Sequence, residues 1–387
     1  MYKKRDLCWF FCGIIVTLHR KETKQQVQTD FADGTFLAVD MNLSIIGTGK
    51  IVHEALPVIA ATEGITVRSI LAREHSRAKA EALAGTFGIE EVTADYASVL
   101  ADPQVDTVYI ALINSVHYEY ALQALQAGKH VILEKPVCLC CRELWSLANE
   151  ARKRKLMLFE AVTLLHLPAF HLLHTELLPQ LGALRHVECN YSQRSSRYDA
   201  YLRGEVLPAF DPSVGGGALM DINIYNLHFV LALLGKPYSA HYYARRGFNG
   251  VDLSGTAVLE YKDPPPTPPV KEGSGCALLS GKAGLSPLFC LCTGAKDTDA
   301  PSFGLLQGDN GWLRIEGPVS TMSSITLCSR GQQPQQIPLP PVTHRLAPEF
   351  FAFADILHRE DYATMNRLLD HSLAVMQTMD ELLTSKT

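Results

Sequence analysis

The feature that most constrains the fold is an alternation of short apolar segments with helical segments over the first half of the chain. Apolar strands are expected at 43–46, 67–72, 105–112, 130–133 and 156–159, and helices at 51–61, 77–87, 117–127 and 141–154. Strands that alternate with helices indicate βαβ units and a parallel sheet. Glu160 ends this pattern, which predicts a first domain over residues 41–160.

After residue 160 the pattern changes. Strands are expected at 187–193, 257–261, 312–316 and 324–328, with one long helix at 218–234 and helices again over 348–383. Strands that do not alternate with helices favour a mostly antiparallel sheet. A chain of 387 residues is also too long for one core. The sequence therefore predicts an α/β first domain, an α+β domain over 161–345, and C-terminal helices over 346–387 that pack back on the body.

Two segments fall outside this plan. Residues 1–40 carry a basic start and an apolar run at 7–18, which is shorter than the ~20 residues of a membrane span. Met41 directly precedes the first strand, so an extension or a misassigned start is expected, with an export signal as the alternative. Residues 262–285 are rich in proline and glycine, which predicts an exposed insertion between two strands.

Composition excludes some classes of partner. The net charge of -5 gives no basic footprint for nucleic acid. The ten cysteines include a nearly adjacent group at 138–141 and a pair within an apolar run at 290–292. We interpret them as reduced thiols of a cytoplasmic protein, and no metal site is expected.

A glycine-rich turn follows the first strand. Gly47, Thr48 and Gly49 precede a helix that starts near Lys50 and Ile51. Glycines at these positions permit a tight turn and a close approach of the backbone to a pyrophosphate, and the helix N-terminus offers unpaired N–H groups. The segment is predicted to bind a dinucleotide, although the third glycine of the usual fingerprint is replaced by Val52.

The end of the second strand bears on which dinucleotide binds. An acidic residue there would bind the ribose hydroxyls of NAD, but the sequence has Ala72 and Arg73. Arg73 could pair with a 2′-phosphate, which favours NADP, with NAD as the alternative. Glu74 is a competing ribose ligand.

Polar residues also follow the third and fourth strands. Asn114 and His117 come after the third strand, and Glu134 and Lys135 come directly before Pro136 at the end of the fourth. Ligands of parallel sheets bind at this carboxyl edge. We expect all four to lie near the cofactor and Lys135 to be catalytic, with a helix-capping role as the alternative for His117.

A helix led by three glycines supplies the remaining candidates. Asp221, Tyr225 and His228 follow Gly215–Gly217 at spacings that place them on one face of an otherwise apolar helix. A polar stripe on a buried helix costs stability unless partners satisfy it. The stripe is expected to face Lys135, and the alternative is a hydrogen-bonded core network.

Together these motifs resemble the glucose–fructose oxidoreductase / inositol dehydrogenase / MocA (Gfo/Idh/MocA) family. The resemblance rests on the 47–49 turn, Asn114 with His117, Glu134-Lys135-Pro136 and the glycine-led helix. It implies an N-terminal Rossmann domain, a second domain with a large open sheet, and a homodimer or homotetramer. It also implies that Lys135 and residues of the glycine-led helix surround the nicotinamide, with Tyr225 where many members have histidine. Ile113 and Asn223 depart from the common pattern.

The resulting hypothesis is an NAD(P)-dependent oxidoreductase that transfers hydride between nicotinamide and a carbinol carbon of a sugar, polyol or cyclic diol. Tyr225 would relay the proton, Lys135 would stabilise the oxygen and lower the phenol pKa, and Asp221 would orient the pair. Tyr191, Arg194, Arg197 and Tyr198 are candidate substrate contacts. The alternative is a regulator that senses NAD(P) or a sugar without turnover.

Overall fold

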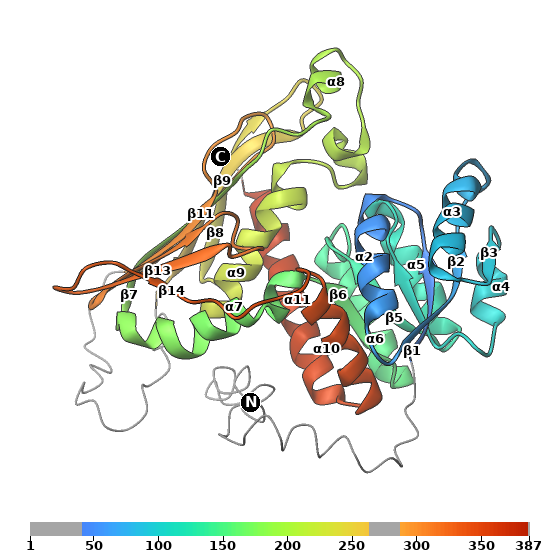
Figure 1. Cartoon of the computed structure of the whole chain (residues 1–387). Coiled ribbons are helices and arrows are strands. Elements are labelled where there is room, and N and C mark those ends of the chain that lie inside the picture. Colours follow the sequence, from blue (N-terminus) through green and yellow to red (C-terminus); the bar gives the residue numbers. More distant parts are fainter. Residues whose placement is uncertain (1–40, 263–286, 386–387) are drawn as a thin grey trace, which may run out of the picture.

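The computed structural model describes residues 41–262 and 287–385 (Figure 1). The expected N-terminal extension and nearly all of the expected insertion lie outside the described residues. Strands β9 and β10 flank that segment and pair with each other, Tyr261 opposite Leu288.

The first part is a parallel sheet of six strands in the order β3-β2-β1-β4-β5-β6. Its strands are β1 (Met41–Ile46), β2 (Ile65–Leu71), β3 (Glu91–Thr93), β4 (Thr107–Ile110), β5 (His130–Glu134) and β6 (Leu158–Ala161). Its helices are α2 (Lys50–Ala61), α3 (Arg77–Phe87), α4 (Tyr96–Ala101), α5 (His117–Gln126) and α6 (Cys141–Arg154), with short turns η2 (Glu74–Ser76) and η3 (Asn114–Val116). The four residues of β4 are all buried, which explains why the central strands read as continuous apolar runs.

The second part contains a sheet of eight strands in the order β14-β13-β12-β11-β7-β10-β9-β8. Its strands are β7 (Leu184–Ser192), β8 (Ser239–Arg246), β9 (Asp252–Tyr261), β10 (Leu288–Ala295), β11 (Phe303–Gly308), β12 (Gly311–Glu316), β13 (Ser324–Ser329) and β14 (Gln335–Ile337). All neighbours run antiparallel except β7 and β10. The predicted fold class, a parallel α/β domain followed by a mostly antiparallel sheet, is confirmed.

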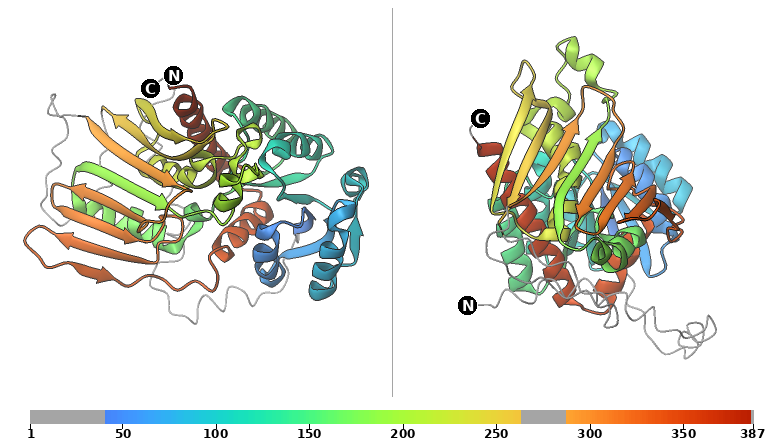
Figure 2. Two further views of the ribbon diagram at one scale, coloured as in Figure 1. Left: turned by 90° about the horizontal axis from the view of Figure 1, so that it is seen from above. Right: turned by 90° about the vertical axis from the view of Figure 1, so that its left-hand side faces the viewer.

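Helices α9 (Ile224–Leu234) and α11 (Tyr362–Thr384) pack on one face of this sheet, whereas α10 (Ala347–His358) packs on the first sheet. The other helices of this half of the chain are α7 (Pro168–Leu172) and α8 (Tyr198–Leu202), with turns η4 (Thr163–His166), η5 (Leu173–Leu177), η6 (Leu178–Leu181), η7 (Pro208–Phe210), η8 (Pro212–Val214) and η9 (Leu219–Asn223). In the right-hand view of Figure 2 the strands spread towards the viewer and the helices lie behind them. On the open face, Tyr243 and Phe289 are 59% and 45% exposed.

Two expected helical regions are interrupted. The helix expected over 218–234 is a π-helical turn, η9, followed by α9. The region expected over 348–383 is two helices, α10 and α11, separated at Glu360, whose φ of 49° ends the first helix. Periodicity alone does not show the π-helical turn, because the apolar spacing continues on either side of it, whereas more than one helix was expected near the C-terminus.

The stretch Pro212–Leu234 is the one helical region among residues 41–262 and 287–385 that is long and apolar enough to cross a membrane. Most of it, 83%, is buried inside the protein. Its apolar character is explained by packing between the sheet and α11, since Leu227, Phe229 and Val230 have no exposed surface.

Candidate active site

The polar candidates meet where the two parts of the molecule come together. Strands β1, β4 and β5 are parallel neighbours and therefore end at the same edge of the sheet. The η9 turn of the second part reaches that edge, because the Lys135 ammonium directly after β5 donates to the main-chain oxygen of Asp221 at 2.7 Å. The structure thus brings Lys135 to the glycine-led helix, as the sequence predicted.

Lys135, Asp221 and Tyr225 form one compact group. Besides the main-chain bond, the Lys135 Nζ lies 3.3 Å from Oδ1 of Asp221. The same Nζ lies 4.8 Å from the centre of the Tyr225 ring. An ammonium this close to an aromatic face is in the range of a cation–π contact. The amine and the phenol, 90 residues apart in sequence, therefore share one site.

The local charges keep Lys135 and Asp221 ionised. Burial opposes the charged form of Lys135, but the electrostatic interactions with Tyr225, Asp221 and Glu134 outweigh it and raise the Lys135 pKa above its usual value. Burial likewise opposes ionisation of Asp221, yet Lys135 and Lys296 hold the pKa of that carboxyl well below its usual range. The ion pair is therefore present throughout the neutral range.

The expectation for the phenol is wrong. A nearby ammonium was expected to lower the Tyr225 pKa, and Lys135 does act in that direction. Burial of the ring has the larger effect, so the Tyr225 pKa lies above its ordinary value of 10.0. The sequence indicates the neighbouring charge of Lys135, but it does not show how deeply the Tyr225 ring is buried. Tyr225 is consequently a neutral phenol at neutral pH, which is the form that donates a proton.

Lys296 is a further member that the sequence analysis missed. Its Nζ lies 2.7 Å from Oδ2 of Asp221, on the opposite side of the carboxylate from Lys135. The side chain is only 3% exposed. Like Lys135, Lys296 follows a buried apolar strand, here β10, and this placement was the available signal. The β10 segment was read only for its cysteines.

The glycine turn fits a dinucleotide. Gly47 has a φ of +123°, and a Cβ at this position would lie 2.5 Å from the main-chain oxygen of Ala111. Only glycine therefore permits this turn. Helix α2 begins at Lys50, its N-cap Gly49 supplies no side-chain bond, and no acidic residue lies in its first turn. Its N-terminal N–H groups can receive a pyrophosphate. Thr48 sits between the glycines at the same edge.

The residues after β2 are placed as expected. Arg73 and Glu74 are both exposed at the carboxyl end of that strand. Arg73 uses its main-chain oxygen to accept from the backbone of Ser76. The Arg73 side chain is therefore open to solvent at this edge of the sheet.

Asn114 and His117 have different surroundings. The Asn114 side chain donates to the main-chain oxygen of Gly215 at 3.1 Å. This bond joins the loop after β4 to the glycine-led segment. His117 has no exposed surface, and its ring nitrogens lie 2.9 Å and 3.2 Å from the main-chain oxygens of Pro136 and Leu112. It therefore cannot touch a ligand, and its expected cofactor contact is corrected. Its ring supports the loops on either side of the site.

Glu134 supports the site from below. Its Oε1 accepts from the hydroxyl of Tyr109 at 2.6 Å. Burial raises the pKa of Glu134, against the opposing effects of Tyr109 and Lys135. Glu134 is only half-buried, directly before Lys135, and its expected contact with the cofactor stays a prediction.

The polar stripe on the glycine-led helix divides in two. Asp221 and Tyr225 face Lys135, but His228 does not. The His228 Nε2 lies 3.7 Å from Oε1 of Glu160, and its Nδ1 lies 3.1 Å from Nε2 of His371. For His228 the core-network alternative is therefore correct. The π-helical turn rotates the helix between Asp221 and the residues after it, which the regular spacing did not allow for.

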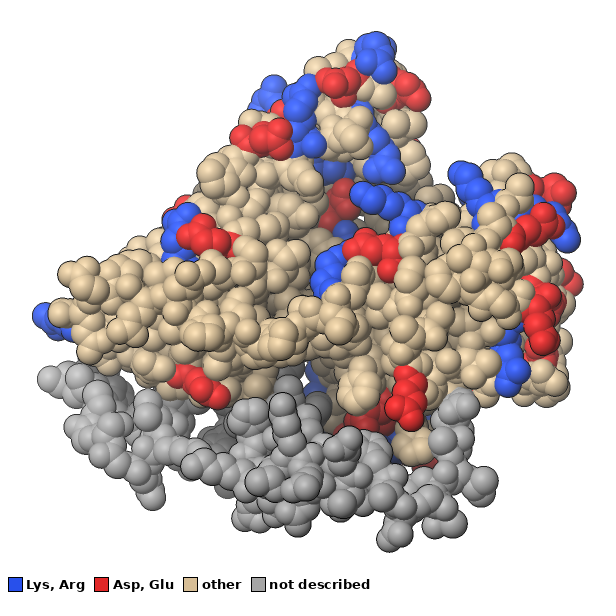
Figure 3. Space-filling model, in the orientation of Figure 1, with Lys and Arg blue, Asp and Glu red and all other residues tan. Residues whose placement is uncertain are grey.

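Of the candidate substrate contacts, Tyr191 is nearest to the site. Its ring centre is 6.1 Å from that of Tyr225. Arg194 lies 4.7 Å above the ring of Tyr198 and pairs with Asp199, farther along the same loop. Arg197 is exposed. Figure 3 shows a hollow between the tip that carries α8 and the nucleotide-binding part, with charged side chains of both signs along it.

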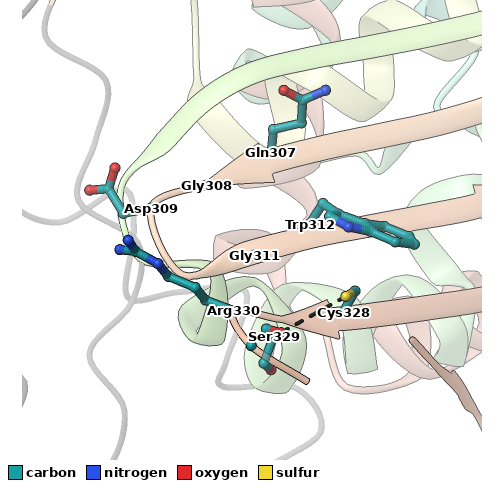
Figure 4. Close-up of a pocket in the computed structure, with 9 residues that line it drawn as sticks. Gln307, Gly308, Asp309, Gly311, Trp312, Cys328, Ser329 and Arg330 are labelled. Atoms are coloured by element: carbon teal, nitrogen blue, oxygen red, sulfur yellow. Dashed lines mark hydrogen bonds between the residues drawn. The ribbon is translucent and has the colours of Figure 1, made fainter. Parts of the chain in front are cut away.

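A second hollow lies elsewhere. A cavity of about 420 Å³ is found at the turns joining β11 to β12 and following β13, beside Trp312 and Cys328 (Figure 4). Asp309 at its rim forms a two-pronged ion pair with Arg185. None of the candidate catalytic residues lines this cavity, so it belongs to the end of the sheet and not to the site.

Comparison with known proteins assigns the family. Residues 41–162 match the oxidoreductase family with an NAD-binding Rossmann fold, and residues 179–264 match the GFO/IDH/MocA C-terminal domain. The uncharacterized oxidoreductase YgjR of Escherichia coli is 31% identical over 89% of this chain and 94% of its own length.

Relatives with named activities align over shorter stretches. The scyllo-inositol 2-dehydrogenase (NADP(+)) IolU of Bacillus subtilis is 33% identical over 57% of this chain and 66% of IolU. The trans-1,2-dihydrobenzene-1,2-diol dehydrogenase of Oryctolagus cuniculus is 30% identical over 56% of this chain and 64% of that enzyme.

Solved structures agree on the fold. KijD10, a 3-ketoreductase from Actinomadura kijaniata crystallised with NADP and TDP-benzene, has a TM-score of 0.73 at 22% identity, covering 89% of this chain and 98% of its own. The aldose-aldose oxidoreductase from Caulobacter crescentus has a TM-score of 0.70 at 18% identity, covering 88% and 96%. Together with the sequence matches and the site, these likenesses show that the chain belongs to the Gfo/Idh/MocA family of NAD(P)-dependent oxidoreductases.

Proposed function

We propose that the protein transfers hydride between nicotinamide and a carbinol carbon of a sugar, polyol or cyclic diol, with Lys135, Tyr225 and Asp221 as its catalytic group. The observation that carries the proposal is the convergence of Lys135 and Tyr225 at the carboxyl edge of the dinucleotide-binding sheet. Relatives that act on an inositol and on a dihydrodiol support the substrate class.

A bound nicotinamide would supply or accept the hydride. The protein's own residues manage the oxygen and its proton. Lys135 has three N–H groups, and two of them point to Asp221. The third is available for a substrate oxygen, where it stabilises developing negative charge. The neutral Tyr225 phenol donates its proton to that oxygen during reduction, and in the reverse direction the Tyr225 phenolate takes the proton from the substrate hydroxyl.

Asp221 fixes the direction of the Lys135 side chain. It contributes both a main-chain oxygen and a carboxylate oxygen to the same ammonium. Holding a charged group at two points limits its movement, so the remaining N–H is aimed before substrate arrives.

NADP is the proposed cofactor, with NAD as the alternative. The exposed Arg73 at the end of β2 and the lack of a carboxylate at Ala72 suit a 2′-phosphate. Gly47, Thr48, Gly49, Lys50 and Ile51 would hold the pyrophosphate, and Asn114 would lie towards the nicotinamide.

The test is a panel of sugars, polyols and cyclic diols, each offered with NAD and with NADP while reduced nicotinamide is followed by absorbance. We expect turnover with at least one diol-containing substrate. In the same assay, Lys135→Met should lower kcat/KM by about 100-fold or more while cofactor binding persists. Cofactor binding with no reduction across the panel would instead favour a regulator that senses NAD(P) or a sugar.

We further propose a cytoplasmic role in carbohydrate metabolism and a homodimer or homotetramer formed through the open sheet face. The exposed Tyr243 and Phe289 on that face support the second point. Light scattering on the purified full chain distinguishes these assemblies from a monomer.

A further inference from the structure

We infer that Lys296 is a positioning residue of the active site, which sets the proton affinity of Lys135 by sharing the Asp221 carboxylate with it. The effect on catalysis rests on the proposed function, in which Lys135 is catalytic. It concerns a buried lysine that lies outside the catalytic group and comes from a different strand.

The first observation is the arrangement of three charges in a row. Asp221 Oδ1 lies 3.3 Å from Lys135 Nζ, and Oδ2 lies 2.7 Å from Lys296 Nζ. Each oxygen of one carboxylate thus pairs with a different ammonium. The closer of the two contacts belongs to Lys296, the residue that does not reach Tyr225.

The second observation is the degree of burial. The Lys296 side chain is 3% exposed, whereas that of Lys135 is 16% exposed. A buried ammonium without a partner is costly, so Lys296 must retain its contacts in the folded state. It also donates to the main-chain oxygen of Ala209 at 2.5 Å and lies 4.8 Å from the centre of the Phe210 ring.

These contacts fix Lys296 from three sides. Its backbone is held as well, since its N–H donates to Leu253 and its oxygen accepts from Ser195. The ammonium is therefore a fixed positive charge beside Asp221, whereas Lys135 presents its third N–H to the cleft. One lysine serves as the anchor and the other remains available for a substrate.

The consequence is electrostatic. The two ammonium groups repel each other, so each lowers the pKa of the other. Each also pairs with only one oxygen of the Asp221 carboxylate. With Lys296 present, Lys135 has only part of the Asp221 charge to itself. Removing the Lys296 charge should therefore raise the pKa of Lys135 and of the adjacent Tyr225, and make both groups hold their protons more tightly.

Two substitutions separate charge from packing. Lys296→Gln removes the charge and keeps a donor for Ala209, whereas Lys296→Arg keeps the charge. Lys129→Gln is the matched control, because Lys129 is also buried and its Nζ bonds two main-chain oxygens, those of Asp102 and Val105, away from the site.

The first measurement needs no turnover. Trace acylation of Lys135 by acetic anhydride from pH 7 to 11, quantified by mass spectrometry on the full chain, reports the fraction of free amine. We expect Lys296→Gln to lower the Lys135 rate about threefold below its pKa, a shift of roughly half a pH unit or more. Lys296→Arg and Lys129→Gln should match the wild-type profile.

The second measurement uses the enzyme assay. The apparent pKa of the kcat/KM profile should rise in Lys296→Gln and should be unchanged in Lys296→Arg. Asp221→Asn should shift the profile more in the Lys296→Gln background than alone, because without Lys296 the whole Asp221 charge acts on Lys135.

The outcomes are distinguishable. An unchanged Lys135 acylation profile in folded Lys296→Gln overturns the inference, whatever the activity. If Lys296→Gln does not fold, the test rests on Lys296→Arg. A shifted Lys135 acylation profile in Lys296→Arg overturns the inference, and a profile equal to that of the wild type supports it. A wild-type protein that turns over no substrate overturns the proposed function and leaves the acylation result standing.

Discussion

At the scale of single residues, Tyr225 is the sharpest test of the chemistry. Tyr225→Phe removes one oxygen and leaves the ring beside Lys135. We expect kcat to fall about 100-fold, because the proposed proton donor is removed, while the KM for cofactor stays the same. Tyr261→Phe is the matched control. Tyr261 is also buried, at the end of β9, and its hydroxyl donates to the main-chain oxygen of Gly235. Steady-state kinetics with near-native kcat in Tyr225→Phe would contradict the role.

Arg73 tests the cofactor. Arg73→Ala should raise the KM for NADP about tenfold, because a charged hydrogen bond to the 2′-phosphate is lost, and should leave the KM for NAD within about twofold. Arg68→Ala is the control. Arg68 is exposed on β2, the strand that precedes Arg73, and its guanidinium donates to the side chain of Asn42. Equal effects on the two cofactors would remove Arg73 from the phosphate site.

The sequence predicted the members of the site better than their electrostatics. Lys135, Asp221 and Tyr225 could be named because strand ends and helical spacing place them. Lys296 was missed because its contacts depend on how the second sheet meets the η9 turn, which no local pattern shows. The Tyr225 pKa was wrong in direction because desolvation depends on the whole fold around the ring.

At the scale of elements, the glycine-led turn into η9 is tightly constrained. Gly217 has a φ of +120°, and a Cβ there would lie 2.0 Å from Oδ1 of Asp252. Asp252 also accepts from the N–H of Leu219 at 2.7 Å, at the start of the π-helical turn. A side chain at 217 would therefore displace the carboxylate that anchors the helix carrying Asp221 and Tyr225.

Gly217→Ala should destabilise the protein by about 2 kcal/mol or more. The midpoint of thermal unfolding should fall by about 4 °C or more. Gly85→Ala is the control, because Gly85 lies in α3 with nothing within 4 Å of an added Cβ, and helix propensity makes that change neutral or stabilising. Equal midpoints for the two variants would contradict the steric argument.

The elements of the first sheet were easier to predict than those of the second. Strands β1, β4, β5 and β6 and the end of β2 are largely buried on both faces and read as apolar runs. Strand β8 was missed because its exposed face carries polar and aromatic residues and it ends in Arg245 and Arg246. Its pairing with β9 comes from the fold, and no short window contains it.

At the scale of the whole molecule, the C-terminal helices join the two parts. Phe350 and Phe353 of α10 belong to the core of the first sheet. On α11, Met376 packs in that core and Met379 in the core of the second sheet. One helix thus contributes to both cores. The relative position of the two sheets, and with it the contact of Lys135 with Asp221, depends on residues near the end of the chain.

This junction contains a buried carboxyl group. Glu349 of α10 is 1% exposed, and its Oε1 has no hydrogen-bond partner among the described residues. Burial raises the pKa of Glu349 well above its ordinary value of 4.5, and the charges of Glu134 and Glu160 act in the same direction. Below pH 4.5 the folded and unfolded states both hold the proton. As pH rises, the unfolded chain releases it first, so the folded state loses relative stability.

Glu349→Gln should remove this loss. The variant keeps the shape and polarity of the side chain and cannot ionise, so its midpoint of thermal unfolding should exceed that of wild type, by a margin that grows from pH 5 to pH 8. Glu90→Gln, the same change on the exposed surface, should show no such growing margin. Differential scanning fluorimetry across that range measures both. A margin independent of pH, or a variant less stable than wild type at pH 8, would mean that Glu349 is stabilised as a carboxylate by its neighbour Arg345, and the junction between the two parts would then be held by charge.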